Sequence, residues 1–361
     1  MSMVKLKINN TEYQAEEGTT ILEMAGKAGI LIPTLCHKDG VEHYTSCMVC
    51  MVKERNSNRF IPSCSSLAQD GMDIDASGEE VIDLRKKSVE LLLSEHRAEC
   101  EAPCMVVCPA GYNIPLMNRY LFAKDFDSAS SLTLSEINTP QIACINCRGY
   151  CENACRRKKV DNPVSIRNIK IFIAKTSLEE NPARLNTEAG KPVKEKKRFL
   201  SQIGKMDAEE LNEYLKECEG DLIRHREIND FLSAASETGS CMHCDCRAAD
   251  NCRLRDIAGE LSVKDPKGKL VYAPIAKKIN RTTGLVFENA KCIKCGLCVR
   301  ICEDSTNEPA LCFISRGFIS IISEPLTENF DNVLKNKAAE CIRVCPTGAL
   351  SDYNALTNNK K

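Results

Sequence analysis

Residues 292–302 read Cys-Ile-Lys-Cys-Gly-Leu-Cys-Val-Arg-Ile-Cys, so that four cysteines follow a C-x2-C-x2-C-x3-C spacing. Cysteines this close along a chain do not pair efficiently in disulfides, but their thiolates can surround a metal centre. The run is typical of iron–sulfur ligation, although C-x2-C pairs also build zinc sites. This stretch therefore predicts a metal-binding domain, with iron–sulfur favoured and zinc as the alternative.

Cysteine is also the outlier in the composition of the whole chain, with 23 among 361 residues. A disulfide scaffold would need an oxidising compartment, whereas metal ligation needs reduced thiolates. The odd number of cysteines and the lack of an apolar leader in MSMVKLKINN favour metal ligation in a cytoplasmic protein. The length allows two to four small domains, and we expect an α+β multidomain protein.

Charge and hydropathy exclude two classes of partner. The 49 basic and 50 acidic residues leave a net charge of −1, whereas nucleic-acid binders usually carry a basic excess. No apolar run approaches the ~18 residues of a membrane-spanning helix. We therefore expect no nucleic-acid partner and no membrane span.

Residues 1–80 predict a β-grasp [2Fe–2S] ferredoxin domain. Two alternating segments flank Asn9-Asn10, which predicts a β-hairpin, and TTILEMAGKAGI (residues 19–30) predicts a capped helix. A cysteine loop with C-x10-C-x2-C-x13-C spacing follows, and it resembles the N-terminal [2Fe–2S] domain of the large iron–sulfur subunit of complex I and of iron-only hydrogenases. His37 and His43 near the loop are expected to be solvated or to support the ligands. The expected ligands are Cys36, Cys47, Cys50 and Cys64.

Residues 81–185 begin with an amphipathic helix over 80–98 and continue with CEAPCMVVCPAGYNIP (100–115) and CINCRGYCENACRRKKVDNPVSIRNIKIF (144–172). These stretches resemble the helical bis-cluster domain of the glutamate synthase small subunit and its relatives. In that family the last cysteine of the first stretch joins the second stretch. The resemblance implies one [4Fe–4S] cluster on Cys108, Cys147, Cys151 and Cys155.

The other cluster of this domain departs from the family pattern. The family uses a further upstream cysteine and an acidic or amide side chain, and these positions carry His96 and Lys170 here. Complex I has a His-plus-three-Cys cluster after its [2Fe–2S] domain, and a neutral imidazole can bind iron. We expect the ligands His96, Cys100, Cys104 and Cys144; the alternative is that His96 is an exposed helix residue.

Residues 186–265 combine a charged linker, KPVKEKKRF (191–199), a helix from Asp207 and the isolated Cys218 with a cysteine-rich segment. That segment predicts a further [4Fe–4S] cluster, with zinc as the alternative. Its end, Cys246-x5-Cys252 followed by Leu254, resembles the tail of the complex I His–Cys motif. The expected ligands are Cys241, Cys244, Cys246 and Cys252.

Residues 266–361 resemble the bacterial-ferredoxin-like domain of the same complex I and hydrogenase subunits, through KCIKCGLCVRICED (291–304), Arg316 to Phe318 and CIRVCPTGAL (341–350). The resemblance implies a [4Fe–4S] cluster on Cys292, Cys295, Cys298 and Cys345. Lys335 and Ala338 occupy two further cysteine positions of the family. The leftover thiols are expected to pack as small apolar side chains, or alternatively to form a fifth cubane: Cys218, Cys302, Cys312 and Cys341.

The motifs that are missing shape the expected function. The chain has no G-x-G-x-x-G, G-x-S-x-G or H-E-x-x-H, and it ends soon after the ferredoxin-like domain. We expect an electron-transfer subunit of a cytoplasmic NAD(P)-linked multisubunit oxidoreductase, with one [2Fe–2S] and about four [4Fe–4S] clusters. Expected partners are an NAD(P)H-oxidising flavoprotein and a ferredoxin, hydrogenase or formate dehydrogenase subunit. The alternatives are an iron–sulfur redox sensor or scaffold, and a self-contained reductase, for which no flavin site is found.

Overall fold

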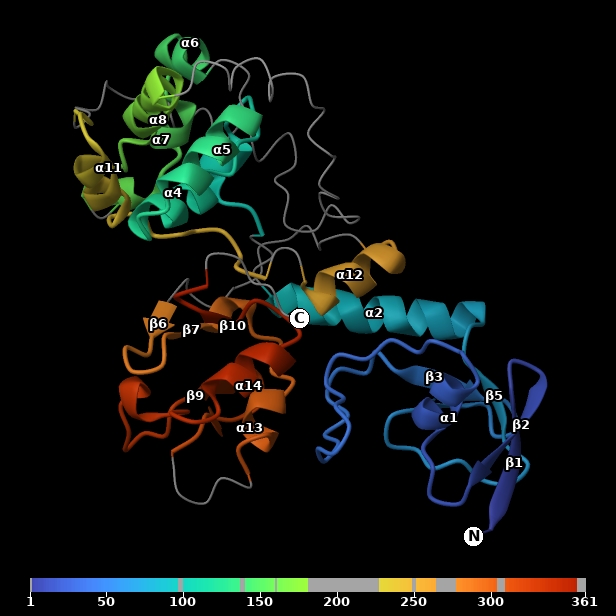
Figure 1. Cartoon of the computed structure of the whole chain (residues 1–361). Helices are drawn as coiled ribbons and strands as arrows, with labels where there is room; N and C mark the ends of the chain where they lie inside the picture. The colour runs from blue at the N-terminus through green and yellow to red at the C-terminus, as the bar shows by residue number, and fades with distance from the viewer. Residues whose placement is uncertain are drawn as a thin grey trace. The chain divides into compact units, whose positions relative to one another are not determined.

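The structure, a computed structural model, describes residues 2–96, 100–136, 140–159, 161–180, 227–248, 251–263, 277–303 and 309–355. These residues form two compact units. The first unit combines the described residues before 99 with those after 250, and the second contains the described residues between them. The second unit is therefore inserted into the sequence of the first, as the colours of Figure 1 show.

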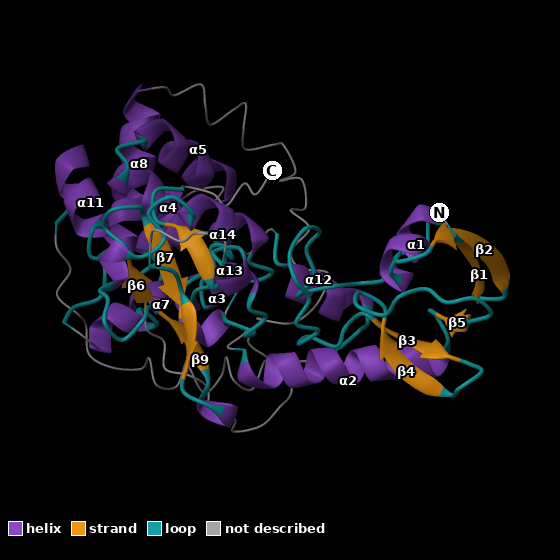
Figure 2. Cartoon of the chain, turned by 90° about the horizontal axis from the view of Figure 1, so that it is seen from below, coloured by secondary structure: helices purple, strands orange, loops and turns teal. Residues whose placement is uncertain are grey.

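The first unit begins with a five-stranded sheet in the order β2-β1-β5-β3-β4 (Figure 2). Strands β1 and β2 form an antiparallel hairpin whose turn residues Asn9 and Asn10 have φ of 49° and 70°, a region that asparagine tolerates well. The predicted hairpin is thus confirmed, and β1 also pairs in parallel with β5. The strands are β1 (Met3–Ile8), β2 (Thr11–Glu16), β3 (Met51–Glu54), β4 (Arg59–Pro62) and β5 (Asp73–Asp75).

Helix α1 (Ile21–Lys27) packs on this sheet, and the predicted capped helix is confirmed. The Thr20 side chain accepts a hydrogen bond from the Glu23 backbone, and the Glu23 carboxylate accepts one from the Thr20 backbone, which makes a capping box. Ile21 packs against Leu6, Ile8 and Ile74 of the sheet in one apolar core. The loop that carries the first cysteines therefore leaves from a fixed helix end.

Helix α2 (Glu79–Glu95) follows the sheet and confirms the amphipathic helix expected over residues 80–98. Its buried residues Val89 and Leu93 share a core with Leu254 and Ile257 of helix α12 (Arg253–Glu260). These two helices stand on either side of the inserted unit in the sequence but pack together within the first unit (Figure 1). Residues from both sides of the insertion therefore complete one core.

The remainder of the first unit is built on short strands and helices. One antiparallel sheet has the order β10-β7-β6, and β8 and β9 form a separate antiparallel pair. Two short helices cover an apolar core that includes Leu285, Phe287 and Leu350 of the sheet. The elements are β6 (Lys277–Ile279), β7 (Leu285–Glu288), α13 (Leu297–Arg300), β8 (Cys312–Ile314), β9 (Ile321–Ser323), α14 (Ala338–Val344) and β10 (Leu350–Asp352).

The described residues of the second unit contain helices and no strand. Their core gathers Tyr112, Ile114 and Met117 with Ile169 and Ile173. The chain as a whole is thus a mixed α and β multidomain protein. The helices are α3 (Pro103–Val106), α4 (Ile114–Phe122), α5 (Phe126–Glu136), α6 (Pro140–Ile145), α7 (Tyr150–Asn153), the 3-10 turn η1 (Arg156–Lys159), α8 (Ile166–Glu180) and α11 (Phe231–Thr238).

Some sequence predictions fall outside the described residues: the charged linker over 191–199, the helix from Asp207 and the isolated Cys218. Among the described helices, none combines the length and the apolar character needed to span a bilayer.

Candidate metal centres

The cysteines of the described ranges carry thiols rather than disulfides, and most of them are buried. Within these ranges no three His, Cys, Asp or Glu side chains converge closely enough to ligate one metal ion. A tetrahedral zinc site needs such convergence, because each Zn–S bond is only about 2.3 Å long. Thiolates that each bind a different iron of a cluster can stand further apart, so the groups described below are compatible with iron–sulfur ligation.

The structure brings the first four predicted cysteines together at one end of the N-terminal sheet. Cys50 directly precedes β3 and Cys64 follows β4, and because these strands pair, the two Sγ atoms lie 3.3 Å apart. The thiols of Cys36 and Cys47 also share a hydrogen bond. The hydrogen bond with Cys50 raises the pKa of Cys64, and burial and the charges of Cys36 and Cys47 raise it further. All four sulfurs therefore lie within one electrostatic neighbourhood.

His37 and His43 lie beside this group and contact each other. Their rings stack with centroids 4.7 Å apart, and their Nδ1 atoms are separated by 3.1 Å. His37 Nε2 lies 3.0 Å from Asp39 Oδ1. Burial, together with the charge of His37, lowers the pKa of His43. The pair thus engages its own ring nitrogens and the Asp39 carboxylate.

A second group lies in the C-terminal part of the first unit. Burial raises the pKa of Cys292 to about 12, and the charge of Cys345 adds to that increase. The same two causes, burial and then Cys345, raise the pKa of Cys295, and burial followed by Cys292, Cys295 and Cys345 raises that of Cys298. The backbone N–H of Lys294 donates to the Cys292 sulfur over 3.3 Å. The structure thus places the four predicted ligands together.

The leftover thiols Cys302 and Cys341 form a pair of their own. Their Sγ atoms lie 3.7 Å apart in the buried core of the same region. Cys312 lies on strand β8, where Ser323 is its partner across the ladder. Two of the four thiols considered for a fifth cubane are therefore in contact, and packing as small apolar side chains describes their surroundings.

In the second unit, a third group of thiols surrounds Lys170 of α8. Its Nζ lies 3.9 Å from the Cys151 Sγ. Burial raises the pKa of Cys144, the charge of Lys170 opposes this, and Cys108 and Cys147 raise it further. The structure thus puts Cys144 with Cys108, Cys147 and Cys151, whereas the sequence grouped Cys155 with those three.

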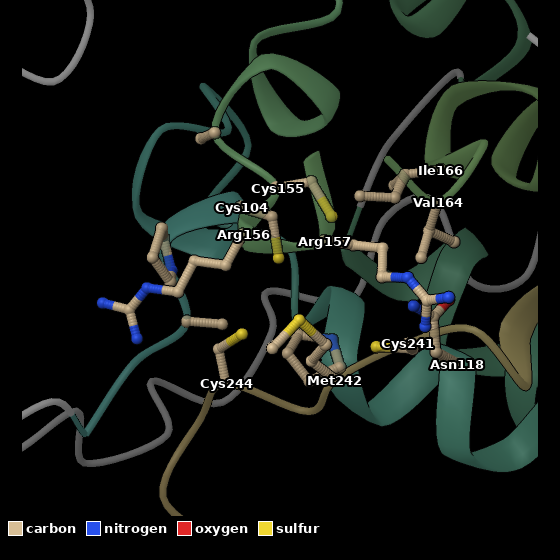
Figure 3. A pocket seen from close by; sticks show the side chains of 14 residues that line it. Cys104, Asn118, Cys155, Arg156, Arg157, Val164, Ile166, Cys241, Met242 and Cys244 are labelled. Atoms are coloured by element: carbon tan, nitrogen blue, oxygen red, sulfur yellow. The ribbon is translucent and has the colours of Figure 1, made fainter. Parts of the chain in front are cut away.

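A fourth group lines a cavity in the second unit (Figure 3). Cys104 comes from α3, Cys155 follows α7, and Cys241 and Cys244 follow α11. Figure 3 shows their sulfur atoms turned toward the shared space, whose free volume is about 350 Å³ including the part open to solvent. Burial raises the pKa of Cys104, and the charges of Cys241, Cys155, Cys151 and Cys244 add to this effect.

Two predicted ligand sets are divided between the units. His96 belongs to the first unit, where its Nδ1 lies 2.9 Å from the Lys291 carbonyl oxygen. It is only 6% exposed, so the alternative reading of an exposed helix residue is wrong. Burial lowers its pKa to about 4, against the effect of the Lys291 carbonyl. Cys100, Cys104 and Cys144, its predicted partners, belong to the second unit.

The predicted set of Cys241, Cys244, Cys246 and Cys252 is divided in the same way. The first three belong to the second unit, where the Cys246 backbone N–H donates to the Cys100 carbonyl over 3.0 Å. Cys252 belongs to the first unit, at the start of α12.

The sequence reasoning missed the side chains that hold the cysteine-rich segment in place. The Arg119 guanidinium on α4 makes a two-pronged ion pair with Asp245, with distances of 3.0 and 2.9 Å. Asn118, the preceding residue, lines the cavity and is 1% exposed. The only sequence signal for these contacts was an acidic residue between two cysteines, Cys244 and Cys246, which does not identify its partner.

Comparisons with known families agree with the two kinds of centre. Residues 1–78 match the family described as "2Fe-2S iron-sulfur cluster binding domain". Residues 85–182 match the family described as dihydropyrimidine dehydrogenase domain II, 4Fe-4S cluster. The chain therefore carries a [2Fe–2S] domain followed by a [4Fe–4S] domain, as predicted.

Curated relatives match parts of the chain. They include the alpha subunit of the NADPH-Fe(3+) oxidoreductase of Geobacter sulfurreducens, which is 34% identical over 116 residues, or 32% of this chain and 13% of the relative. The gamma subunit of the NAD-reducing hydrogenase HoxS of Cupriavidus necator is 31% identical over 97 residues, 27% of this chain and 41% of the relative. The mitochondrial 78 kDa subunit of the NADH-ubiquinone oxidoreductase of Candida albicans is 27% identical over 100 residues, 28% of this chain and 14% of the relative. The chain thus spans less than half of each of these relatives.

Among solved structures, a chain of the NAD+-reducing [NiFe]-hydrogenase in the H2-reduced state is similar in fold. The TM-score is 0.52 at 15% sequence identity, and the match covers 97% of this chain and 87% of that chain. The predicted relationship to the iron–sulfur subunits of complex I and of NAD-linked hydrogenases is confirmed.

Proposed function

We propose that this chain is the electron-transfer subunit of an NAD(P)-linked multisubunit oxidoreductase. The observation that carries the proposal is the presence of several separate groups of buried thiols in one chain, within domains whose families bind [2Fe–2S] and [4Fe–4S] clusters. A bound cluster would accept and release one electron at a time. The curated relatives, which are subunits of NADH, NADPH and hydrogenase enzymes, support this role.

The finer domain assignment is part of this proposal. We assign residues 1–80 to a β-grasp [2Fe–2S] domain, because the parallel β1–β5 pair lies between antiparallel strands and α1 covers the sheet. Residues 81–185 form a helical [4Fe–4S] domain, 186–265 a linker with a cysteine-rich segment, and 266–361 a ferredoxin-like [4Fe–4S] domain. We keep one [2Fe–2S] and about four [4Fe–4S] clusters per chain.

The ligands of three centres follow from the thiol groups. Buried thiols have raised pKa values, and cationic irons would favour the thiolate form that ligation needs. We assign the [2Fe–2S] cluster to Cys36, Cys47, Cys50 and Cys64, and two [4Fe–4S] clusters to Cys292, Cys295, Cys298 and Cys345 and to Cys108, Cys144, Cys147 and Cys151.

In this proposal a cytoplasmic flavoprotein subunit oxidises NADH or NADPH and delivers electrons singly to this chain. A ferredoxin, a hydrogenase subunit or a formate dehydrogenase subunit accepts them. Such partners must dock on this chain, because electron tunnelling falls steeply with distance.

The test starts with the complex purified anaerobically from its native host, with its co-eluting subunits identified. We expect NADH or NADPH to bleach the visible absorbance of the clusters within the turnover time of the complex. The chain alone should contain iron and sulfide but no stoichiometric flavin, and should stay oxidised with either nucleotide. Reduction much slower than turnover would instead support a redox sensor, and flavin on the chain alone would contradict the proposal.

A further inference from the structure

We propose that Cys104, Cys155, Cys241 and Cys244 together hold one iron–sulfur cluster of the second unit. This inference rests on the proposed iron–sulfur function and goes beyond it, because it joins a cysteine pair from the cysteine-rich segment to the helical domain. In the sequence, Cys241 and Cys244 were grouped with Cys246 and Cys252 instead.

The four thiols converge from three separate parts of the chain. Cys104 and Cys155 come from the two cysteine stretches of the helical domain, and Cys241 and Cys244 from the turn after α11. All four are half-buried and line the same cavity, whereas Cys246 is not among its lining residues. Cys151 also lies near Cys104, but its own closest charges are Lys170, Cys108 and Cys147. The geometry therefore separates two sets of four thiols in this unit.

Three contacts fix the cysteine-rich segment against the helices. Asp245 makes the two-pronged ion pair with Arg119 of α4, a residue 126 positions away in the sequence. The guanidinium of Arg157, which closely follows Cys155 in the chain, donates to the Ser240 carbonyl over 3.0 Å. The backbone N–H of Cys246 donates to the Cys100 carbonyl. Paired, largely buried groups of this kind hold a chain segment far better than exposed ones.

The polar groups around the cavity fit a cluster with sulfur atoms at its surface. Asn118 is 1% exposed, and neither its amide nitrogen nor its amide oxygen has a hydrogen-bond partner of normal geometry. A buried amide left this way is costly, and a cluster sulfide or ligand sulfur would accept its N–H. The amide already lies close to the Cys241 sulfur, since burial raises the pKa of that thiol and Asn118 lowers it.

Backbone donors complete the surroundings. The N–H groups of Val164, Arg157 and Lys158 point at the Cys155 sulfur and lower the pKa of that thiol, against the larger effect of burial. Hydrogen bonds to ligand sulfurs are among the features that set the potential of a cluster. The site also replaces the upstream cysteine of the resembled helical family, whose position is His96 in this chain.

The first test uses the full chain, reconstituted anaerobically, and counts iron and spectroscopic signals in Cys→Ser variants. Cys104→Ser and Cys241→Ser should each lose about four irons and the same electron paramagnetic resonance signal. The double variant should lose no more than either single variant, because both residues serve one cluster. A loss of about eight irons from the double variant, with two signals gone, would overturn the inference.

Cys246→Ser separates the two groupings directly. If Cys241, Cys244, Cys246 and Cys252 were one set, Cys246→Ser would abolish the signal that Cys241→Ser abolishes; we expect that signal to persist. Cys312→Ser, in the first unit and outside these groups, is the matched control and should keep the full iron content. Circular dichroism spectra matching the wild type would exclude misfolding as the cause of any loss.

Asn118→Leu provides a test that leaves all four thiolates in place. We expect the midpoint potential of the Cys104-dependent signal to fall, because a hydrogen-bond donor to its sulfurs is gone, while the other signals stay unchanged. An unchanged potential for that signal would count against the site. If the wild-type chain holds no labile sulfide at all, the proposed function itself fails; if it does, but the Cys104 and Cys241 losses add, only this inference fails.

Discussion

Lys170 is a lysine buried among thiols. Its side chain is 3% exposed, and its ammonium lies 3.9 Å from the Cys151 sulfur and 5.6 Å from the centre of the Tyr112 ring. Burial lowers the pKa of this lysine, but the neighbouring thiols Cys151, Cys108 and Cys144 outweigh it and hold the pKa above its usual value. At the position where the resembled family has an acidic or amide side chain, this chain thus has a fixed positive charge.

We expect this charge to raise the potential of the cluster on Cys108, Cys144, Cys147 and Cys151, because reduction adds negative charge beside it. Lys170→Met keeps the side-chain length and removes the charge, and should lower that potential by roughly 60–120 mV. A redox titration followed by electron paramagnetic resonance measures the shift. Lys175→Met, on an exposed position of the same helix, should change nothing. An unchanged or raised potential in Lys170→Met would show that the ammonium does not act on this centre.

At the scale of single elements, α2 ties the N-terminal sheet to the rest of its unit. Arg85, 5% exposed on this helix, donates through Nε and Nη2 to the Met51 carbonyl at 3.0 and 2.8 Å. Met51 begins β3 and directly follows Cys50. Burial lowers the pKa of Arg85, but the guanidinium remains charged at any physiological pH. The helix therefore fixes the backbone on which one predicted [2Fe–2S] ligand stands.

Arg85→Met should remove both hydrogen bonds and leave the Met51 carbonyl without its donor. We expect the free energy of unfolding to fall by roughly 2–4 kcal/mol. The [2Fe–2S] signal should also decay faster in the presence of a chelator. Denaturant unfolding and the time course of the signal measure the two effects. Lys87→Met, exposed on the same helix, is the control. Equal stability and equal cluster lifetime in both variants would contradict this role of Arg85.

Local elements were predictable from the sequence because their signals are local. The Asn9-Asn10 turn, the Thr20 cap and the apolar spacing of α2 each act within a few residues. The grouping of thiols in the second unit was not, since spacing links Cys241 to its neighbours in the chain. What brings it to Cys104 is the Arg119–Asp245 ion pair, which depends on how the turn after α11 packs on α4.

At the scale of the whole molecule, the second unit interrupts the first in sequence but not in packing. Val89 and Leu93 of α2 share their core with Leu254 and Ile257 of α12, and Cys36, Cys47 and Cys295 border the same core. The first unit therefore has a continuous interior of its own.

Replacing residues 99–249 by a flexible Gly/Ser linker should leave this interior intact. We expect the shortened chain to keep the signals that depend on Cys50 and on Cys298, and to lose those that depend on Cys108 and Cys104. Electron paramagnetic resonance and thermal unfolding of the reconstituted protein provide the measurement. Loss of the Cys50-dependent signal, with the full chain treated identically as the control, would mean that the first unit needs the inserted one to fold.

The shared core of α2 and α12 also has a consequence for synthesis on the ribosome. Helix α2 leaves the exit tunnel roughly 150 residues ahead of α12, an interval on the order of 10–30 s at ~5–20 residues per second. During that interval Val89 and Leu93 have no partner from α12, while the whole inserted unit is being made. The nascent chain thus exposes an apolar helix face until its last third emerges, and the order of translation places the completion of the inserted unit before the closure of the unit that surrounds it.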